Sequence, residues 1–173
     1  LGLPYFLRNA LLTTTIKTKE QLLAPLMTSS PEAQFGLKDF AHINHALASE
    51  YLSAAMDKQV SGISLLLYGE SGNGKTEFAR TLAKVTHRQL IEVRAKDTKQ
   101  TATQNEFGYP FASDERLQSL KLLQTLLGSN SNAMLLIDEC ESLFDQADTR
   151  YTKERLQRFI EYTQVPCIWI TNY

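Results

Sequence analysis

The chain has 173 residues, of which 43% are hydrophobic and 21% are charged. These proportions are close to the average of soluble globular proteins, so they exclude a disordered or fibrous chain and indicate a single domain. The 18 basic residues nearly balance the 19 acidic ones, and without a basic run nucleic acid is not expected as the main ligand. The apolar runs are far shorter than the roughly 20 residues of a membrane-spanning helix, so we expect no span.

The two cysteines, Cys140 and Cys167, lie in or beside apolar stretches and lack the spacing of metal ligands. This pattern favours reduced, buried thiols in a cytoplasmic protein, with no disulfide between them. No targeting segment is recognisable, and the first residue is not Met. We therefore expect the chain to be a piece of a longer protein.

The first sixty residues contain two helical candidates. An apolar helix is expected within residues 7–26, followed by a polar break at residues 28–31, where a proline prevents the helix from continuing. A second helix is expected over residues 41–58, with Ile43, Leu47 and Ala54 at helical spacing.

From residue 63 onward, short apolar runs alternate with amphipathic helices, which is the pattern of a parallel sheet covered on both faces. The predicted strands are residues 63–68, 89–93, 133–138 and 167–171. Each of the helices between and after them carries apolar residues at helical spacing. These are Phe78, Leu82 and Val85 in the first, Leu120, Leu123 and Leu127 in the second, and Leu156, Phe159 and Ile160 in the third.

A glycine-rich sequence, GESGNGKT, follows the first predicted strand and opens the next helix. It matches GxxxxGKS/T, the phosphate-binding loop, in the context that this motif requires. Its glycines let backbone amides curl around phosphate oxygens, and the helix N-terminus adds positive potential. Lys75 is expected to reach the β- and γ-phosphates, and Thr76 to offer its hydroxyl to Mg²⁺. The predicted nucleotide-binding residues are Gly69, Glu70, Ser71, Gly72, Asn73, Gly74, Lys75, Thr76 and Glu77.

The third predicted strand ends in two carboxylates, Asp138 and Glu139. This is the carboxyl end of a buried strand, where open α/β sheets bind ligands. Asp138 is expected to hold Mg²⁺ together with Thr76. Glu139 is expected to orient or deprotonate a water molecule in line with the γ-phosphate. The alternative is a solvated acidic turn without a catalytic role.

The fourth predicted strand likewise ends in a polar residue, Asn172. Asn172 could lie between the phosphate loop and Glu139 and hydrogen-bond either the attacking water or the γ-phosphate, although asparagine is also common in ordinary turns. The predicted catalytic residues are therefore Glu139, Lys75 and Asn172. The predicted cofactors are ATP or ADP and Mg²⁺.

In this order and spacing, the sequences GESGNGKT, LLIDE and WITN resemble the Walker A, Walker B and sensor 1 motifs of AAA+ ATPases. The likeness covers residues 36–173 and extends to a poorly characterised bacterial branch. It implies a P-loop parallel sheet ordered 5-1-4-3-2, with the fifth strand and the helical lid domain missing here. Residues 1–35 would then be an N-terminal helical and linker segment, and residues 36–173 a partial nucleotide-binding α/β domain.

The resemblance also implies ATP hydrolysis coupled to remodelling of a protein or complex, in a homo-oligomeric ring whose neighbours complete each site. Residues 35–43 would pack near the adenine, with Phe40 or Ile43 as contacts. The segment Phe107-Gly108-Tyr109 lies where such ATPases grip a polypeptide. Because the lid and arginine finger would be missing, the 173 residues alone should hydrolyse ATP very slowly.

Two other functions fit parts of the pattern. An ATP-switched initiator or loader acting on DNA shares the motifs, but the balanced charge disfavours it. Residues 138–141, DECE, superficially match the DExx box of helicases, whereas the Thr-Asn end of the fourth strand favours AAA+. The sequence does not identify the remodelled substrate or the ring size.

Overall fold

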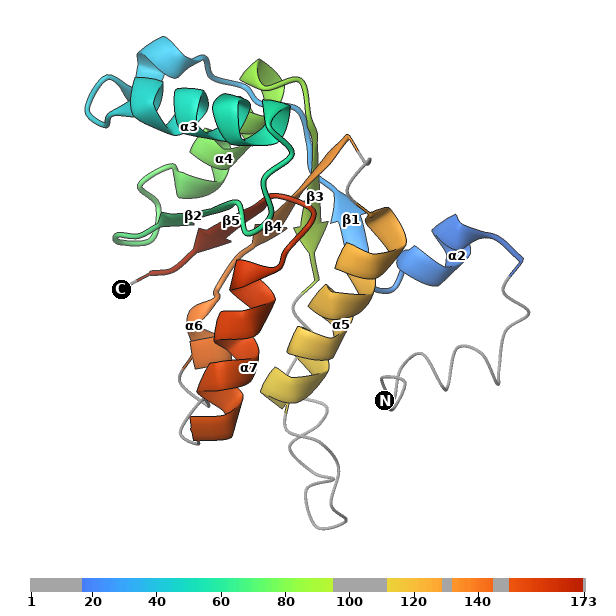
Figure 1. Cartoon of the computed structure of the whole chain (residues 1–173). Helices are drawn as coiled ribbons and strands as arrows, with labels where there is room; N and C mark the ends of the chain where they lie inside the picture. The colour runs from blue at the N-terminus through green and yellow to red at the C-terminus, as the bar shows by residue number, and fades with distance from the viewer. Residues whose placement is uncertain (1–16, 95–111, 129–131, 145–149, 173) are drawn as a thin grey trace.

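The computed structural model describes residues 17–94, 112–128, 132–144 and 150–172. Its centre is a sheet in the order β1-β3-β4-β5-β2, with helices on both faces (Figure 1). The strands are β1 (Met27–Ser29), β2 (Ser64–Leu67), β3 (Gln89–Val93), β4 (Ala133–Ile137) and β5 (Cys167–Ile170). The helices are α2 (Lys19–Leu23), the 3₁₀ helix η1 (Leu37–Phe40), α3 (His45–Asp57), α4 (Lys75–Val85), α5 (Ala112–Leu127), α6 (Glu141–Phe144) and α7 (Arg150–Glu161).

The four strands predicted from the sequence are all present and parallel. Strand β5 lies between β2 and β4, with Leu65 and Leu136 both in register with Ile168, and β3 follows on the far side of β4. This arrangement confirms the predicted order 1-4-3-2 for these strands. It places β2 at one edge of the described sheet.

The sheet is not entirely parallel, which corrects the sequence prediction. Two residues of the expected polar break, Thr28 and Ser29, instead belong to β1, which pairs antiparallel with β3, Thr28 opposite Glu92. The segment was missed because its Thr and Ser side chains are exposed, so the edge strand lacks an apolar pattern. Main-chain hydrogen bonds attach it to β3, while Leu26 and Met27 pack on the core at its start.

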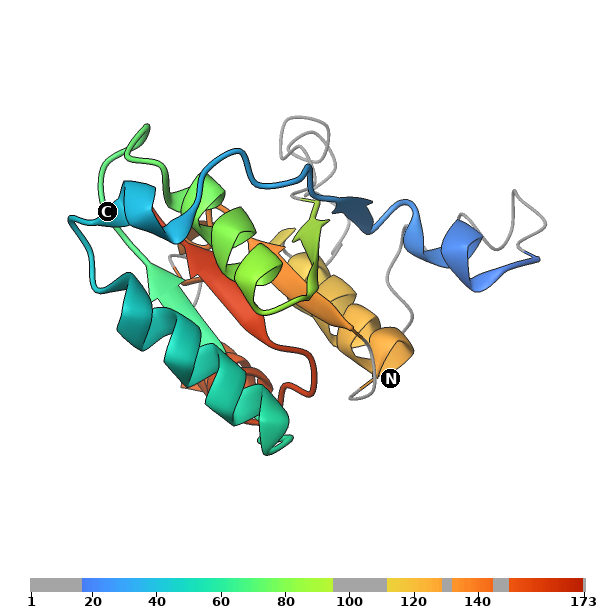
Figure 2. The ribbon, with the colours of Figure 1, turned by 90° about the horizontal axis from the view of Figure 1, so that it is seen from above.

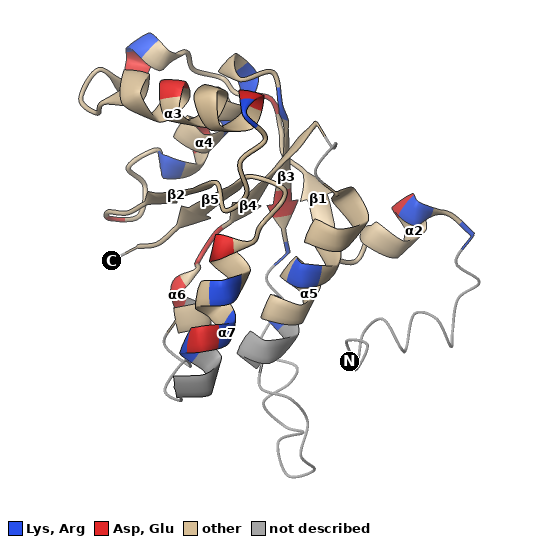
Figure 3. Ribbon diagram, viewed as in Figure 1, with Lys and Arg blue, Asp and Glu red and all other residues tan. Residues whose placement is uncertain are grey.

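The two central strands are buried on both faces, and each face has its own core. In β4, Leu135 and Ile137 pack with α5 and α7, whereas Met134 and Leu136 pack with α3 and α4. The helices of the two faces lie on opposite sides of the sheet (Figure 2). Neither β4 nor β5 contains a charged residue (Figure 3). Successive residues of each strand therefore belong to different cores, and a one-residue slip would exchange the two apolar sets.

The helices differ from the predictions mainly near the N-terminus. Only α2 forms within the described part of residues 7–26, and α3 begins at His45 because the Asn44 side chain caps it, accepting from the Leu47 amide at 3.2 Å. Leu52 and Met56 are the buried residues of α3, while Leu47 is 63% exposed. The predicted apolar face of this helix was therefore wrong. The segment Phe107-Gly108-Tyr109 lies outside the described residues.

Both cysteines are buried free thiols, as predicted. Cys167 pairs with Leu135 in the middle of β4, whereas Cys140 lies in the turn after that strand. Burial raises the pKa of Cys167 to about 12, although a hydrogen bond from Gln124 opposes this shift. None of the described helices is long and apolar enough to cross a membrane.

Candidate nucleotide-binding site

The glycine-rich loop connects β2 to α4 and depends on backbone conformations that favour glycine. Gly69, Gly72 and Gly74 have φ values of 136°, 86° and 79°. A Cβ at Gly72 would meet no atom within 4 Å, so conformation and not crowding requires glycine there. Gly74 is the N-cap of α4 and, having no side chain, makes no side-chain cap hydrogen bond to this helix. The first amides of an α-helix lack intrahelical acceptors, and such a helix N-terminus is suited to bind an anion.

Lys75 lies at the start of this helix and curls back over the loop. Its ammonium group donates to the Gly69 carbonyl at 2.8 Å and to the Glu70 carbonyl at 2.7 Å. Thr76 follows it on α4 and is partly exposed. The loop therefore combines main-chain amides, one cation and one hydroxyl, which is a donor set suited to phosphate.

The carboxyl ends of three adjacent strands are joined at this edge of the sheet. The Thr171 amide donates to the Leu67 carbonyl at 3.0 Å, and the Cys140 amide donates to the Ile170 carbonyl at 2.9 Å. These bonds connect the strand before the phosphate loop to β5, and β5 to the turn that follows β4. The end of β5, which carries the exposed Asn172, therefore lies between the other two.

The acidic turn after β4 has an unusual backbone. Glu139 has a φ of 49°, in the left-handed region that non-glycine residues rarely occupy. The Glu139 amide donates to the Asp138 carboxylate at 2.8 Å. Asp138 and Glu139 are both exposed, in contrast to the fully buried strand before them. The two carboxylates thus stand at the same sheet edge as the phosphate loop.

Arg116 on α5 contacts this turn and was not singled out from the sequence. Its guanidinium donates to the Glu139 carbonyl at 2.8 Å and also to the Asp138 carbonyl. Burial lowers the pKa of Arg116, while the nearby acidic groups, including Cys140 and Glu139, oppose the shift. Arginine remains protonated in proteins, so a positive charge lies directly behind the acidic turn.

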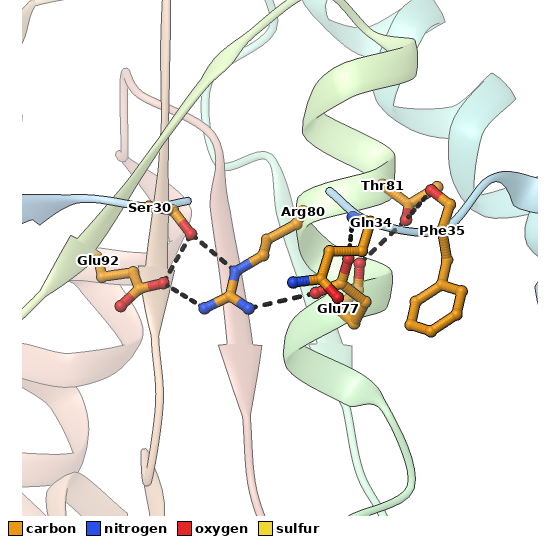
Figure 4. Close-up of polar contacts among 7 residues, drawn as sticks. All are labelled: Ser30, Gln34, Phe35, Glu77, Arg80, Thr81 and Glu92. Carbon is orange, nitrogen blue, oxygen red and sulfur yellow. Dashed lines mark hydrogen bonds and ion pairs between the residues drawn. The ribbon is translucent and has the colours of Figure 1, made fainter. Parts of the chain in front are cut away.

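A second group of polar contacts, the Arg80 cluster, joins α4 to the N-terminal segment (Figure 4). Arg80 donates to the Ser30 hydroxyl at 3.0 Å and pairs with Glu92 at 3.0 Å and Glu77 at 3.2 Å. Glu77 also accepts from the Gln34 amide. The Glu77 side chain, predicted from the sequence to belong to the nucleotide site, is thus engaged by the linker.

Hydrogen bonding also changes the acidity of Glu77. Burial alone would raise the pKa of this carboxyl, but hydrogen bonds from the amides of Gln34 and Phe35 and from Arg80 lower it below its ordinary value. The Thr81 hydroxyl donates to the Phe35 carbonyl at 3.1 Å. Residues 34 and 35 are therefore held against α4, immediately behind the phosphate loop.

The two residues expected near the adenine differ in accessibility. Phe40 is 7% exposed and packs against Phe78, with 5.0 Å between ring centroids. A Cβ on Gly74 would lie 3.8 Å from the Phe40 ring. Ile43 is 38% exposed. Phe40 thus supports the loop from within the core, and Ile43 is the more accessible of the two.

The oxygen donors at this edge fit magnesium better than a transition metal. Among the described residues, no three His, Cys, Asp or Glu side chains are grouped to hold a metal ion. A nucleotide-bound Mg²⁺ needs only one or two protein oxygen ligands, because phosphate and water supply the rest. The Thr76 hydroxyl and the Asp138 carboxylate are oxygen donors of this kind.

The parallel sheet, the glycine loop and the helix that follows it define a P-loop nucleotide-binding domain. The model of the AAA family, described as the ATPase family associated with various cellular activities, matches residues 65–173. This match covers more than half of the chain, and the chain belongs to that family of ATPases.

Individual relatives match over more limited regions. The ATP-dependent protease ATPase subunit HslU of Lactiplantibacillus plantarum is 43% identical over 44 residues, which are 25% of this chain and 9% of that protein. Among solved structures, the FIGL-1 AAA domain in complex with ADP has a TM-score of 0.52 and 18% identity, covering 92% of this chain and 56% of its own. C. elegans PCH-2 has a TM-score of 0.49 and 18% identity, covering 75% and 37%. The chain thus spans only part of each relative, and the FIGL-1 likeness shows the fold alone.

Proposed function

We propose that this domain binds ATP with Mg²⁺ and hydrolyses it. The observation that carries the proposal is the meeting of three strand ends, through the Thr171–Leu67 and Cys140–Ile170 main-chain hydrogen bonds. A phosphate loop alone is consistent with a simple nucleotide binder. An acidic turn and an exposed amide on adjoining strand ends supply the further groups that hydrolysis needs.

Each predicted residue has a role that follows from its chemistry. Lys75 and the loop amides bind the β- and γ-phosphates, while Thr76 and Asp138 hold the metal. Bound Mg²⁺ would neutralise charge that develops on the phosphate oxygens. Glu139 orients the attacking water and accepts its proton. Asn172 donates a hydrogen bond to that water or to the γ-phosphate.

We further propose that hydrolysis in the full-length protein drives remodelling of a protein or complex in a homo-oligomeric ring. The HslU relative is by its name the ATPase subunit of a protease, which supports a protein substrate for this chain as well. The nearly balanced charge supports the same choice, because a DNA loader would need basic residues to bind phosphate backbones. The division at residue 35 into a linker segment and a nucleotide-binding domain remains part of this proposal.

Calorimetry with ATP and a steady-state phosphate-release assay on the full-length protein test the activity. We expect binding that requires Lys75 and turnover that requires Glu139. Binding without measurable turnover under any condition, with or without added protein substrate, would leave a nucleotide switch as the function. Size-exclusion chromatography with light scattering in the presence of ATP tests the ring, and a monomer at all concentrations would exclude it.

A further inference from the structure

The backbone of the acidic turn is strained at the residue proposed to activate water. Glu139 has a φ of 49° although it is not glycine. Such a conformation costs about 1–3 kcal/mol and persists only where the surroundings hold it in place. The contacts that hold it are therefore part of the site, and they identify residues that act on Glu139 without touching the nucleotide.

Within the part of the chain that the structure describes, three sets of hydrogen bonds hold this turn. The Asp138 carboxylate accepts from the Glu139 amide, and the Cys140 amide donates to Ile170 on β5. The third set comes from α5, where the Arg116 guanidinium donates to the carbonyls of both Asp138 and Glu139. Arg116 thus binds two consecutive carbonyls of the turn from a different element. It spans the strained residue itself.

We propose that Arg116 is a positioning residue for ATP hydrolysis, which clamps the carbonyls of Asp138 and Glu139 and so fixes where their carboxylates stand. The inference rests on the proposed function, because positioning matters only if these carboxylates serve Mg²⁺ and water. Arg116 acts through main-chain carbonyls and does not need to contact phosphate. The planar guanidinium suits this role, since its fixed fork of N–H groups can bind two acceptors at once.

The charge of Arg116 has a second effect at the same place. Asp138, Glu139 and Glu141 all lie close enough to interact electrostatically with the guanidinium. A cation behind the turn reduces the repulsion between neighbouring carboxylates. A lysine at position 116 would retain this charge but would lose the fork. The two contributions are therefore separable by substitution.

The test uses the full-length protein with Arg116→Met and Arg116→Lys. Arg94→Met is the matched control, because Arg94 is exposed and its side chain donates to Thr28 at the outer strand. Three quantities are measured for each variant: kcat and KM for ATP, the ratio of nucleotide Kd values with and without Mg²⁺, and the midpoint of thermal unfolding.

We expect Arg116→Met to lower kcat by about 10- to 100-fold, the range found when partners that orient metal ligands are removed. KM and the metal-free Kd should change by less than about threefold, because the phosphate loop is untouched. The gain in affinity on adding Mg²⁺ should shrink, since Asp138 is less well placed. Arg116→Lys should recover part of the lost turnover, and Arg94→Met should match the wild type.

A purely structural role gives a different result. Arg116→Met would then lower the unfolding midpoint but leave kcat and the Mg²⁺ ratio unchanged at temperatures well below it, and the proposal would be wrong. If Arg116→Met does not fold, Arg116→Lys decides, because full wild-type turnover there would exclude the clamp. A wild-type protein without turnover contradicts the proposed function, whereas the Mg²⁺ ratio still decides whether Arg116 positions the metal ligand.

Discussion

Two arginines hold two parts of this domain in different ways. Arg80 on α4 binds side chains, one hydroxyl and two carboxylates, and thereby attaches the linker to the helix behind the phosphate loop. Arg116 on α5 binds main-chain carbonyls at the acidic turn. Arg80 is paired with opposite charges, whereas the acceptors that Arg116 binds in the turn are neutral carbonyls.

The two kinds of contact should have different effects when they are removed. Side-chain pairs such as those of the Arg80 cluster determine how two segments pack, and their loss should appear mainly as reduced stability. A clamp on main-chain carbonyls determines the conformation of the chain between them, so its loss should move catalytic groups. Substitutions at the carboxyl edge, where β2, β4 and β5 end, should therefore change ATP binding or turnover with little change in the unfolding midpoint. Substitutions in the Arg80 cluster should lower the unfolding midpoint with little change in turnover.

The largest effect is expected for Glu139→Gln at the carboxyl edge. The amide can occupy the same place but cannot accept a proton, so turnover in the full-length protein should fall by about 10² to 10⁴. ATP affinity and the unfolding midpoint should stay close to the wild type. Phosphate release and calorimetry measure these quantities. Glu141→Gln makes the same chemical change beside the turn, and equal losses in both variants would contradict a specific role for Glu139.

Lys75→Ala should abolish most ATP binding. Hydrogen bonds between charged groups contribute about 1.5–3 kcal/mol each, so loss of the ammonium should weaken ATP affinity by about 100-fold. Calorimetry measures the change, with Lys84→Ala at the other end of α4 as the control. Undiminished affinity of Lys75→Ala would refute the phosphate-loop assignment.

The sequence predicted the features of the site that depend on residues adjacent in the chain. The phosphate loop, the acidic pair and Asn172 each follow an apolar strand, and the parallel sheet brings these strand ends to one edge. Local order was therefore enough to group Lys75, Asp138 and Asn172. Their roles remain predictions, because ATP hydrolysis depends on the distances between these side chains and the nucleotide, which a sequence pattern does not specify.

The sequence did not indicate either arginine. Arg80 reaches Ser30 and Glu92, and Arg116 reaches a turn more than twenty positions away, so both contacts arise only from tertiary packing. In sequence, each arginine is one more charged residue on an amphipathic helix. The β1 strand was missed for a related reason, since its pairing with β3 depends on main-chain groups that are common to all residues.

The Arg80 cluster should affect stability more than activity. Arg80→Met removes two ion pairs and a hydrogen bond, and because the Arg80 side chain is 22% exposed, the loss should be about 1–2 kcal/mol. This corresponds to a fall of about 2–8 °C in the unfolding midpoint for a domain of this size. Differential scanning calorimetry measures this fall in the unfolding midpoint, with Arg94→Met as the control. A large loss of Mg²⁺-dependent turnover in Arg80→Met, without a change in stability, would overturn the division between the two arginines.

The smallest expected effect is a pH dependence of folding stability that arises from Glu77. Hydrogen bonds lower the folded-state pKa of this carboxyl below its ordinary value of 4.5. Its charged form therefore stabilises the folded state fully above pH 4.5, and the contribution is lost as the pH falls through the lower folded-state pKa. Glu77→Gln retains an acceptor for the Gln34 amide but has no charge to lose.

Urea unfolding of the wild type and Glu77→Gln at pH 7, 5 and 3.5 measures this contribution. The wild type should be more stable at pH 7 and pH 5, by at most about 1 kcal/mol because the ion pair with Arg80 is partly exposed to solvent. The difference should shrink between pH 5 and pH 3.5, because the stabilisation by the charged carboxylate is lost progressively as the pH falls below 4.5. If the difference in the free energy of unfolding stays constant down to pH 3.5, the effect of Glu77→Gln would come from the shape of the side chain and not from its charge. The linker would then be attached to α4 by the neutral hydrogen bonds of the cluster, Thr81 to Phe35 among them.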